Sequence, residues 1–408
     1  MIKPQEIWSE YQTGINYHTT TGLYEAVELN QNFVNGDQWH GVNAPDIEKP
    51  VFNILRPAVD WFNSMLVSDD IAIQCDFGHA VTNEEPTTTE EEALKITKQA
   101  IESLVTKSIY DVWERTKYKA RLRDFVRIAC VDGGSYKHWW YDTTKIVSEK
   151  YKGCISMELI DNMNVIYGDP SNPDEQKQPY IIVVSKLPTD SVKKMVSKNL
   201  QDGILSNYDD LANLVHYCKT TENVIIKPDT DLGLKMYPIS KMNWKTKKSS
   251  YQGVSPLTEV IPNQIMINKS YMMINEYLKK TSFPKLVYNQ DLIPEWSNKV
   301  EALAVHGDPR ESVASATPLI QMNSQLFEHC NNLIDKTNKT LGIQDVSLGS
   351  VAPNNTSAII ALQKTAAQPL ELQRLALYEA TENDVRIIVD LMSVFYGVRT
   401  MPIETEQG

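Results

Sequence analysis

The chain lacks the short motifs that mark the commonest nucleotide-binding and metal-dependent enzymes. It has neither a G-x-x-x-x-G-K-[ST] phosphate loop nor a G-x-G-x-x-G dinucleotide fingerprint. It also has no H-E-x-x-H zinc-binding helix and no G-x-S-x-G nucleophile elbow. Its seven histidines are scattered, and no two of them stand at the spacing of metal ligands. We therefore expect no enzymatic activity, no catalytic residues, no cofactor and no metal site.

Cysteine is also scarce, and long apolar runs are missing. The five cysteines are an odd number and none stands in a C-x-x-C pair, which is typical of reduced thiols in a cytosolic setting. No stretch approaches 18 uncharged apolar residues, so we expect no transmembrane helix. The N-terminus has no apolar run behind a basic start, which predicts that the chain carries no secretory signal.

Basic residues are fewer than acidic ones. The chain has 40 Lys and Arg and 52 Asp and Glu, which gives a net charge of −12. A surface that wraps the DNA backbone is usually basic, since it neutralises phosphates. The balance argues against such a surface but allows a protein that lets DNA pass without holding it. With 408 residues, 42% of them hydrophobic, the chain is long enough for two or three globular domains.

The first 250 residues mix helical and strand patterns and predict an α+β domain. Apolar residues recur at helical spacing over 5–35, with a polar break near 19–21, and over 51–67 and 91–129. Period-two alternation predicts strands at 71–77, 136–141, 155–160, 164–168, 180–187, 224–226 and 235–244. Short helices are expected at 191–199 and 208–215. The strands after Gly133 predict a small antiparallel sheet.

The second half predicts two amphipathic helices that flank a small module. Residues 263–280 and 324–342 are helical in pattern, the second with a Ser cap at its start and Gly342 at its end. Between them we expect strands at 283–290 and 318–322 and a turn or short helix at 293–300. A polar loop then leads into a very long helical stretch that ends near Tyr396, in which Pro369 predicts a kink.

Three weaker patterns leave alternatives open. Acids near predicted strand ends would suit a metal-dependent nucleic-acid enzyme or would be ordinary turn residues: Asp76, Asp132, Asp161 and Asp169. A basic run at four-residue spacing would meet phosphates or an acidic partner, or would be a solvated face: Arg115, Lys119, Arg123 and Arg127. The Glu-rich segment 84–92 of the same or an adjacent subunit could supply the counter-charge. Gly133-Gly134-Ser135 is expected to be a tight turn before a strand, with a phosphate-binding loop as the less favoured alternative.

Three segments carry a family resemblance. They are N-F-V-N-G-D-Q-W at 32–39 with P-V-F-N-I-L-R-P at 50–57, Y-Q-G-V-S-P-L at 251–257 with I-P-N-Q-I-M-I-N-K at 261–269, and N-T-S-A-I-I-A-L at 355–362. In order and context they resemble portal proteins, the head-to-tail connectors of tailed double-stranded DNA bacteriophages. The resemblance spans about residues 20–396. A different capsid-associated adaptor or minor head protein is the other assembly-protein hypothesis.

The resemblance implies a portal-like organisation. It comprises a mixed wing domain over 1–250, a first stem helix over 251–282, an inserted small α/β clip over 283–323, a second stem helix over 324–342, a tunnel loop over 343–357, a long kinked helix of the wing and crown over 358–396, and a short tail over 397–408. Family members often carry a further helical crown, for which only about a dozen residues remain here.

The resemblance also implies a function. Portals are ring oligomers, normally of twelve subunits, at one capsid vertex, and the phage genome is packaged and ejected through their channel. The implied partners are other copies of the chain, double-stranded DNA, the terminase large subunit, the major capsid protein with its scaffold, and a head-completion or tail adaptor protein. The implied location is the virion, with assembly in the host cytoplasm and no membrane.

Candidate site residues follow from this organisation. The loop facing the channel would present Gln344, Asp345, Ser347, Ser350, Asn354 and Asn355. Rings of positive charge in the channel, or ion pairs across subunit boundaries, would involve Lys269, Lys279, Lys280, Lys336 and Lys339. Docking of the packaging motor on the clip would involve Asn289, Gln290, Glu295, Trp296, Asp308 and Arg310.

Overall fold

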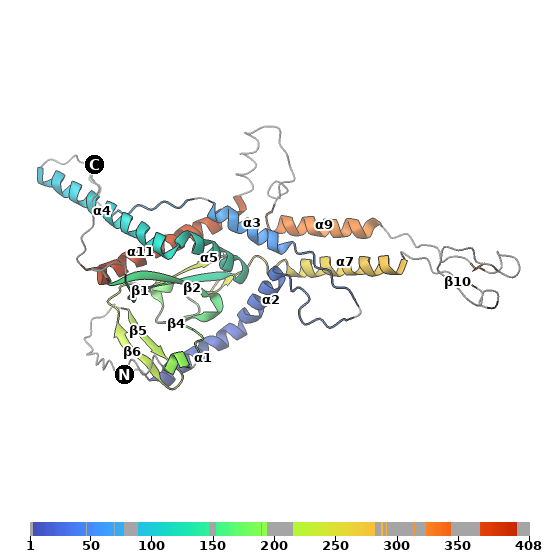
Figure 1. Cartoon of the computed structure of the whole chain (residues 1–408), viewed down its shortest axis with the longest axis horizontal. Coiled ribbons are helices and arrows are strands. Elements are labelled where there is room, and N and C mark those ends of the chain that lie inside the picture. Colours follow the sequence, from blue (N-terminus) through green and yellow to red (C-terminus); the bar gives the residue numbers. More distant parts are fainter. Residues whose placement is uncertain are drawn as a thin grey trace.

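A small antiparallel sheet lies at the centre of the molecule (Figure 1). The computed structural model describes residues 3–45, 47–68, 70–76, 89–146, 152–188, 190–193, 215–281, 287–288, 291, 313–314, 324–343 and 368–397. The central strands pair in the order β2-β1-β7 and comprise β1 Gly134–Ile146, β2 Lys152–Asp161 and β7 Ile239–Asn243. Trp139 lies opposite Met157, and Tyr136 lies opposite Lys241, so successive residues of β1 face opposite sides of the sheet.

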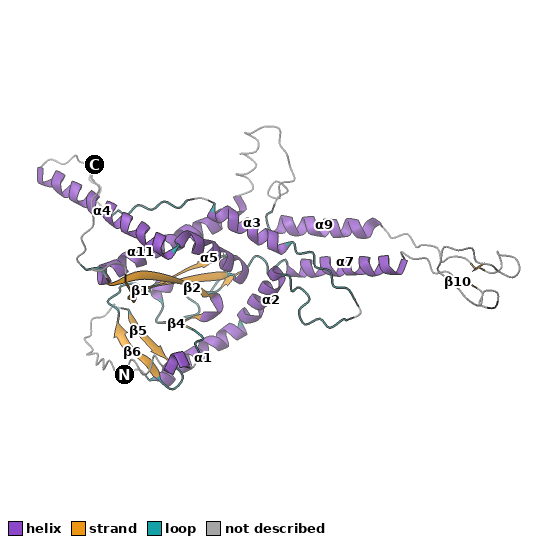
Figure 2. Cartoon of the chain, viewed as in Figure 1, coloured by secondary structure: helices purple, strands orange, loops and turns teal. Residues whose placement is uncertain are grey.

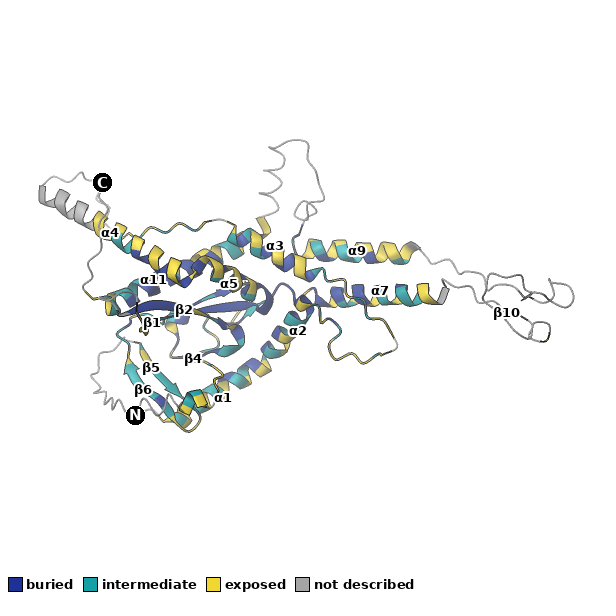
Figure 3. Cartoon of the chain, viewed as in Figure 1, coloured by how far each residue is buried: buried dark blue, intermediate teal, exposed yellow. Residues whose placement is uncertain are grey.

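The two faces of this sheet bury different side chains. Trp139, Met157 and Met242 join the main hydrophobic core, which includes residues of α5 Tyr118–Asp132 and α11 Glu371–Phe395. Tyr136 on the opposite face packs in a second cluster with Tyr167 and Tyr251. Because both faces are covered, β1 and β2 are drawn largely as buried in Figure 3.

The other elements surround this centre. The remaining helices are α1 Pro4–Thr20, α2 Leu23–Asn35, α3 Leu55–Val67, α4 Thr89–Thr116, α7 Ile261–Thr281 and α9 Ser324–Thr340, with short 3-10 turns η1 Asn162–Asn164, η2 Glu175–Lys177 and η3 Gln368–Leu370. The two-stranded pairs are β3 Val165–Tyr167 with β4 Ile181–Val183, β5 His216–Thr220 with β6 Ile225–Asp231, β8 Lys245–Thr246 with β9 Gly253–Val254, and β10 Val287–Tyr288 with β11 Val313–Ala314. The predicted α+β class is confirmed (Figure 2). None of the described helices combines the length and the apolarity that crossing a bilayer requires.

Each of the two long helical stretches predicted in the first half forms two helices, the first pair divided next to the polar break expected near 19–21. The stretch 5–35 divides into α1 and α2 at Gly22, which has a φ of 69°. The stretch 91–129 divides into α4 and α5 at Lys117, whose φ of 52° lies in the left-handed region. The helix predicted from residue 51 begins only at Leu55, because the Asn53 carboxamide accepts from the backbone N–H groups of the first turn.

The strand predicted at 71–77 is wrong over the part that the structure describes. The segment 70–76 lies along α4, where the Ile73 N–H donates to the Tyr110 hydroxyl at 3.0 Å and the Cys75 N–H donates to Thr106 Oγ1 at 3.3 Å. Side chains of a helix therefore take the place of a partner strand, which no period-two pattern can reveal.

The strands predicted after Gly133 are found, with shifted ends. The stretches 136–141, 155–160, 164–168, 180–187, 224–226 and 235–244 correspond to β1, β2, β3, β4, β6 and β7. The pattern missed β5 because His216–Thr220 shows no apolar alternation. Of the two short helices expected nearby, only 190–193 is described as helical, and nearly all of the rest lies outside the described residues.

The second half forms the helix pair that its pattern predicts. α7 and α9 lie side by side and extend away from the sheet-centred body (Figure 1). Cys330, Thr337 and Leu341 on the predicted inner face of α9 are buried. Between the helices the structure describes only β10 paired with β11 and Asp291, so the predicted strand at 318–322 and turn at 293–300 lie outside the described residues.

Pro369 stands at the start of the described part of the last helical stretch. It lies in the 3-10 turn η3, directly before α11 begins at Glu371. Residues 358–367 of the predicted long helix lie outside the described residues, so the kink angle stays a prediction.

Candidate functional site at the root of the projecting helices

Two of the family-like sequence segments meet at one place, where α7 leaves the body. Gln38 follows α2, Phe52 and Ile54 precede α3, and Gln264 and Asn268 stand one turn apart on α7. In the folded chain their polar groups bond to one another across more than 200 residues of sequence. We call these five residues the stem root.

Buried carboxamides hold the stem root together. Gln264 Nε2 donates to the Phe52 carbonyl at 2.7 Å, and its Oε1 accepts from the Ile54 N–H at 3.2 Å. Asn268 Oδ1 accepts from the Phe52 N–H at 3.3 Å, and its Nδ2 donates to Gln38 Oε1 at 2.5 Å. Gln264 is 0% exposed and Asn268 is 2% exposed. Because buried polar groups are costly when unpaired, this network specifies one orientation of α7.

The loops that receive α7 are themselves held by side chains. Asn53 Nδ2 donates to the Phe33 and Val34 carbonyls, both at 3.0 Å, at the end of α2. Trp39 Nε1 donates to the Pro50 carbonyl at 3.0 Å and closes the loop between the two segments. The Trp39 side chain therefore fixes this loop through a contact within the subunit.

The chain that leads into α7 is tied to α5 and α2. Gly253 lies against Gly133, where an added Cβ would come within 2.0 Å of the Gly133 carbonyl oxygen, so only glycine fits. Ser255 Oγ donates to the Cys130 carbonyl at 2.7 Å, and Asn30 Nδ2 donates to the Val131 carbonyl at 2.8 Å. The turn predicted at 133–135 is thus the end of α5 and the contact point for the base of α7.

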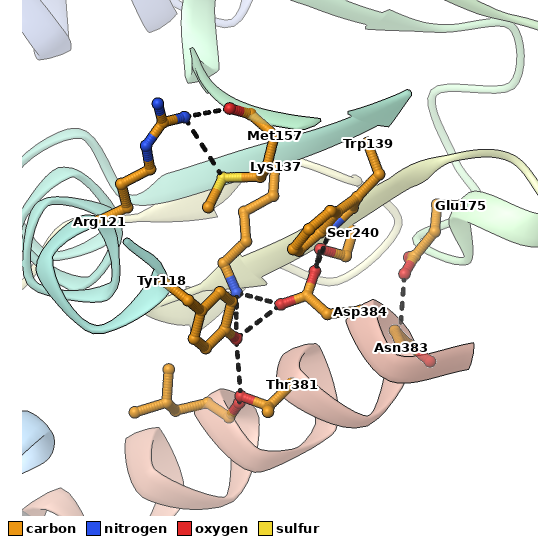
Figure 4. A network of polar contacts seen from close by, with 11 residues as sticks. Tyr118, Arg121, Lys137, Trp139, Met157, Glu175, Ser240, Thr381, Asn383 and Asp384 are labelled. Carbon is orange, nitrogen blue, oxygen red and sulfur yellow. Dashed lines mark hydrogen bonds and ion pairs between the residues drawn. The ribbon is translucent and has the colours of Figure 1, made fainter. Parts of the chain in front are cut away.

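A second buried network joins α11 to the sheet (Figure 4). Asp384 of α11 and Lys137 of β1 are both fully buried, with 2.5 Å between Oδ2 and Nζ. Tyr118 OH donates to the same Oδ2 at 2.8 Å, while Trp139 Nε1 at 2.7 Å and the Ser240 hydroxyl donate to Oδ1. The carboxylate therefore accepts four hydrogen bonds from β1, β7 and the start of α5.

Burial sets the electrostatics of this network. Desolvation lowers the pKa of Lys137, and the adjacent Asp384 carboxylate opposes that lowering. Desolvation and the same carboxylate raise the pKa of Tyr118, so its hydroxyl stays a donor. Since neither Lys137 nor Asp384 has exposed surface, the pair positions α11 and offers nothing to a substrate.

The candidate lysines of the projecting helices differ in their surroundings. Lys279 Nζ lies 2.9 Å from Glu48 and 3.7 Å from Glu276 of its own subunit, and the Glu48 carboxylate raises its pKa. Lys269, Lys336 and Lys339 are exposed on the outer faces of α7 and α9. The side chain of Lys280 lies outside the described residues.

The other residues predicted from the family resemblance are not described. The loop residues Gln344, Asp345, Ser347, Ser350, Asn354 and Asn355 and the clip residues Asn289, Gln290, Glu295, Trp296, Asp308 and Arg310 lie outside the described residues, as does the third family-like segment at 355–362. Their roles stay predictions.

The strand-end acids do not form a metal site in the described part of the chain. Asp169 Oδ1 accepts from Ser171 in a turn, which is the ordinary structural use of such an acid. Asp132 is 7% exposed and accepts from Gln31 Nε2 at 2.6 Å, and burial raises its pKa to about 6. Asp161 lies near enough to contribute to that rise.

The basic run does not form one continuous helical face. Arg115 belongs to α4, whereas Lys119, Arg123 and Arg127 belong to α5, because the chain turns at Lys117. Lys119 pairs with Asp70 at 2.6 Å on the surface, so part of the run has counter-charge within the subunit.

Sequence reasoning missed Lys137 and Asp384 as structural residues. A lysine in a strand and an aspartate in a helix ordinarily indicate exposed positions, and only the packing of α11 on the sheet buries both. One sequence pattern could have indicated that Asp384 is buried. It shares one helical face with four apolar residues, Leu377, Ala380, Ile387 and Leu391.

No protein-family model matches the chain, and no curated protein matches it.

Proposed function

We propose that the chain is a structural subunit of a ring of the portal type, through whose channel a phage genome is packaged and ejected. One observation carries this proposal: two long antiparallel helices project from the body while apolar side chains remain exposed on them and around their base. Met266 is 51% exposed, Met273 52% and Phe327 43%. Exposed apolar clusters of this kind mark surfaces that other protein covers.

The arrangement of the projecting pair supports a ring. The stem root locks α7 at a fixed angle to the body, so every copy would present the same surfaces in the same relative positions. When two different surfaces of identical copies meet with a constant rotation, the assembly closes into a ring if that rotation divides a full turn, and otherwise forms a helical filament. The net charge of −12 suits a channel wall that repels the DNA backbone and does not hold it.

The portal assignment rests on this geometry together with the sequence resemblance. The family-like segments at 32–39, 50–57 and 251–269 lie at the base of α7, where a portal-like stem would join its wing. The partners of the proposal are those of the family: DNA, the terminase large subunit, capsid and scaffold proteins, and a tail adaptor. The proposed role is structural and not enzymatic, and its proposed location is the virion.

Negative-stain electron microscopy of the purified full-length chain tests the proposal. We expect rings with a central hole wide enough for a DNA duplex, with one subunit number dominating the class averages. Compact monomers at every concentration up to the millimolar range would contradict it. Metal-dependent DNA cleavage that is lost in Asp132→Ala would instead support the nuclease alternative.

A further inference from the structure

Two exposed helical strips at the base of the projecting pair have the same residue spacing. Both are mainly apolar, and their single charges have opposite sign. On α7, Met266, Lys269 and Met273 stand at positions i, i+3 and i+7 and are all exposed. On α11, Leu372, Leu375 and Glu379 stand at the same spacing and are also exposed. We call these the α7 strip and the α11 strip.

Within the described part of the chain, the packing of the subunit does not account for either strip. Leu372 is 75% exposed and Leu375 is 55% exposed, which is unusual for leucines side by side on one helical face. The inward sides of the same helices are well buried, since Ile267 is 0% exposed on α7 and Leu377 is 0% exposed on α11. The inward sides of these helix turns are therefore already packed, and the strips are additional apolar surface on their outer sides.

The charges of the two strips are complementary. Lys269 interrupts the methionines of the α7 strip, and Glu379 follows the leucines of the α11 strip. In the described part of the chain neither forms an ion pair, although Glu379 opposes the lowering of the Lys241 pKa that burial causes. Nearby charged residues are paired: Lys279 with Glu48, and Arg386 with Glu382.

The positions of the strips suit contact between copies related by rotation about one axis. An added Cβ on Gly342 would lie 3.1 Å from Pro369 Cβ, so α11 begins beside the end of α9, at the root of the pair. The α7 strip begins near the same root, at the sixth residue of α7, and extends to the thirteenth. In Figure 1 the start of α11 lies on the α9 side of the pair, and α7 forms the other side. A head-to-tail contact needs two such different surfaces at one level of the molecule.

We propose that the α11 strip of one copy packs against the α7 strip of the next, with Glu379 paired to Lys269 across the boundary. Methionine adapts its shape to the leucines that it meets, which favours this combination of side chains. The inference rests on the proposed ring and specifies which surfaces close it.

Charge reversal tests the pairing in the full-length chain. Lys269→Glu and Glu379→Lys should each raise the concentration for half-maximal assembly at least about tenfold in sedimentation experiments, because each places like charges together. The double variant should restore assembly toward the wild-type value. Lys235→Glu and Glu222→Lys, both on exposed loops elsewhere in the body, serve as matched controls and should leave assembly unchanged.

A second variant tests the apolar part. Leu372→Asp should block assembly, whereas Leu187→Asp, at a leucine 40% exposed outside both strips, should not. Unchanged circular dichroism and thermal midpoints would verify that the variants fold. The interface would be overturned if the wild type forms rings and the single variants assemble equally well. It would also be overturned if the double variant assembles no more readily than either single variant. Both outcomes would leave the ring proposal standing. A wild-type chain that never assembles would overturn both.

Discussion

At the scale of single residues, Asp132 has an unfavourable place for a carboxylate. It ends α5, is 7% exposed, and accepts a hydrogen bond from Gln31 Nε2 at 2.6 Å. Burial, with a smaller contribution from Asp161, raises its pKa from 3.8 to about 6. The folded chain therefore holds this proton more tightly than the unfolded chain does.

The raised pKa predicts how stability depends on pH at this residue. Its contribution is most favourable below about pH 4, declines as the pH rises to about 6, and stays low above that. Asp132→Asn should raise the free energy of unfolding by about 2 kcal/mol at pH 8 and leave it nearly unchanged at pH 4. Urea titrations at both pH values measure this, with Asp124→Asn, at an exposed position of the same helix, as the control. An equal gain at both pH values would show that ionisation is not the cause.

Lys137 and Asp384 predict a non-additive pair. Asp384→Asn leaves a buried lysine without its counter-charge and should cost about 3–5 kcal/mol of unfolding free energy. The double variant Lys137→Met with Asp384→Asn should lose less, because the asparagine Oδ1 still accepts from Trp139 and no buried charge remains. Denaturant unfolding of the two single variants and the double variant gives the coupling energy. Strict additivity would contradict the buried-pair account.

At the scale of elements, the orientation of α7 depends on side chains more than on helix propensity. Gln264→Ala removes the donor to the Phe52 carbonyl and the acceptor of the Ile54 N–H. We expect a loss of about 2–4 kcal/mol and faster amide hydrogen exchange at Phe52 and Ile54, because both buried backbone groups lose a partner. Asn263→Ala, one residue earlier and half-buried, is the matched control.

Hydrogen exchange followed by mass spectrometry distinguishes a local effect from general loosening. The amides of β1 should exchange as slowly in Gln264→Ala as in the wild type, since the sheet does not depend on this side chain. Uniformly faster exchange throughout the chain would argue that the carboxamide network supports the whole fold and has no specific role at the stem root.

The elements also show where local pattern was sufficient. The helices at 263–280 and 324–342 were predictable because each has a one-sided apolar face, and a helix needs only near neighbours in sequence. The break at Lys117 was not, since no proline or glycine stands there and the left-handed conformation of a lysine is imposed by packing around Trp113 and Tyr118, whose rings stack at 4.4 Å.

At the scale of the whole molecule, the described structure gives a body and a projecting pair held at one angle. Exposed apolar strips on both sides of the root are what a ring subunit would leave uncovered before it assembles. The assembly experiments above therefore address the molecule as a unit, because a variant at the root can disturb the ring without unfolding the body.

The sequence by itself determined the α+β class, the two amphipathic helices and the turn residues, because these depend on periodicity and on neighbours a few residues away. It also determined the acidic balance and the absence of common catalytic motifs. Only the tertiary structure decided that Gln38, Phe52 and Gln264 meet at the stem root, that Asp384 and Lys137 are buried together, and that 70–76 lies on a helix. Those outcomes depend on contacts between residues far apart in the chain, whose pairing no local pattern encodes.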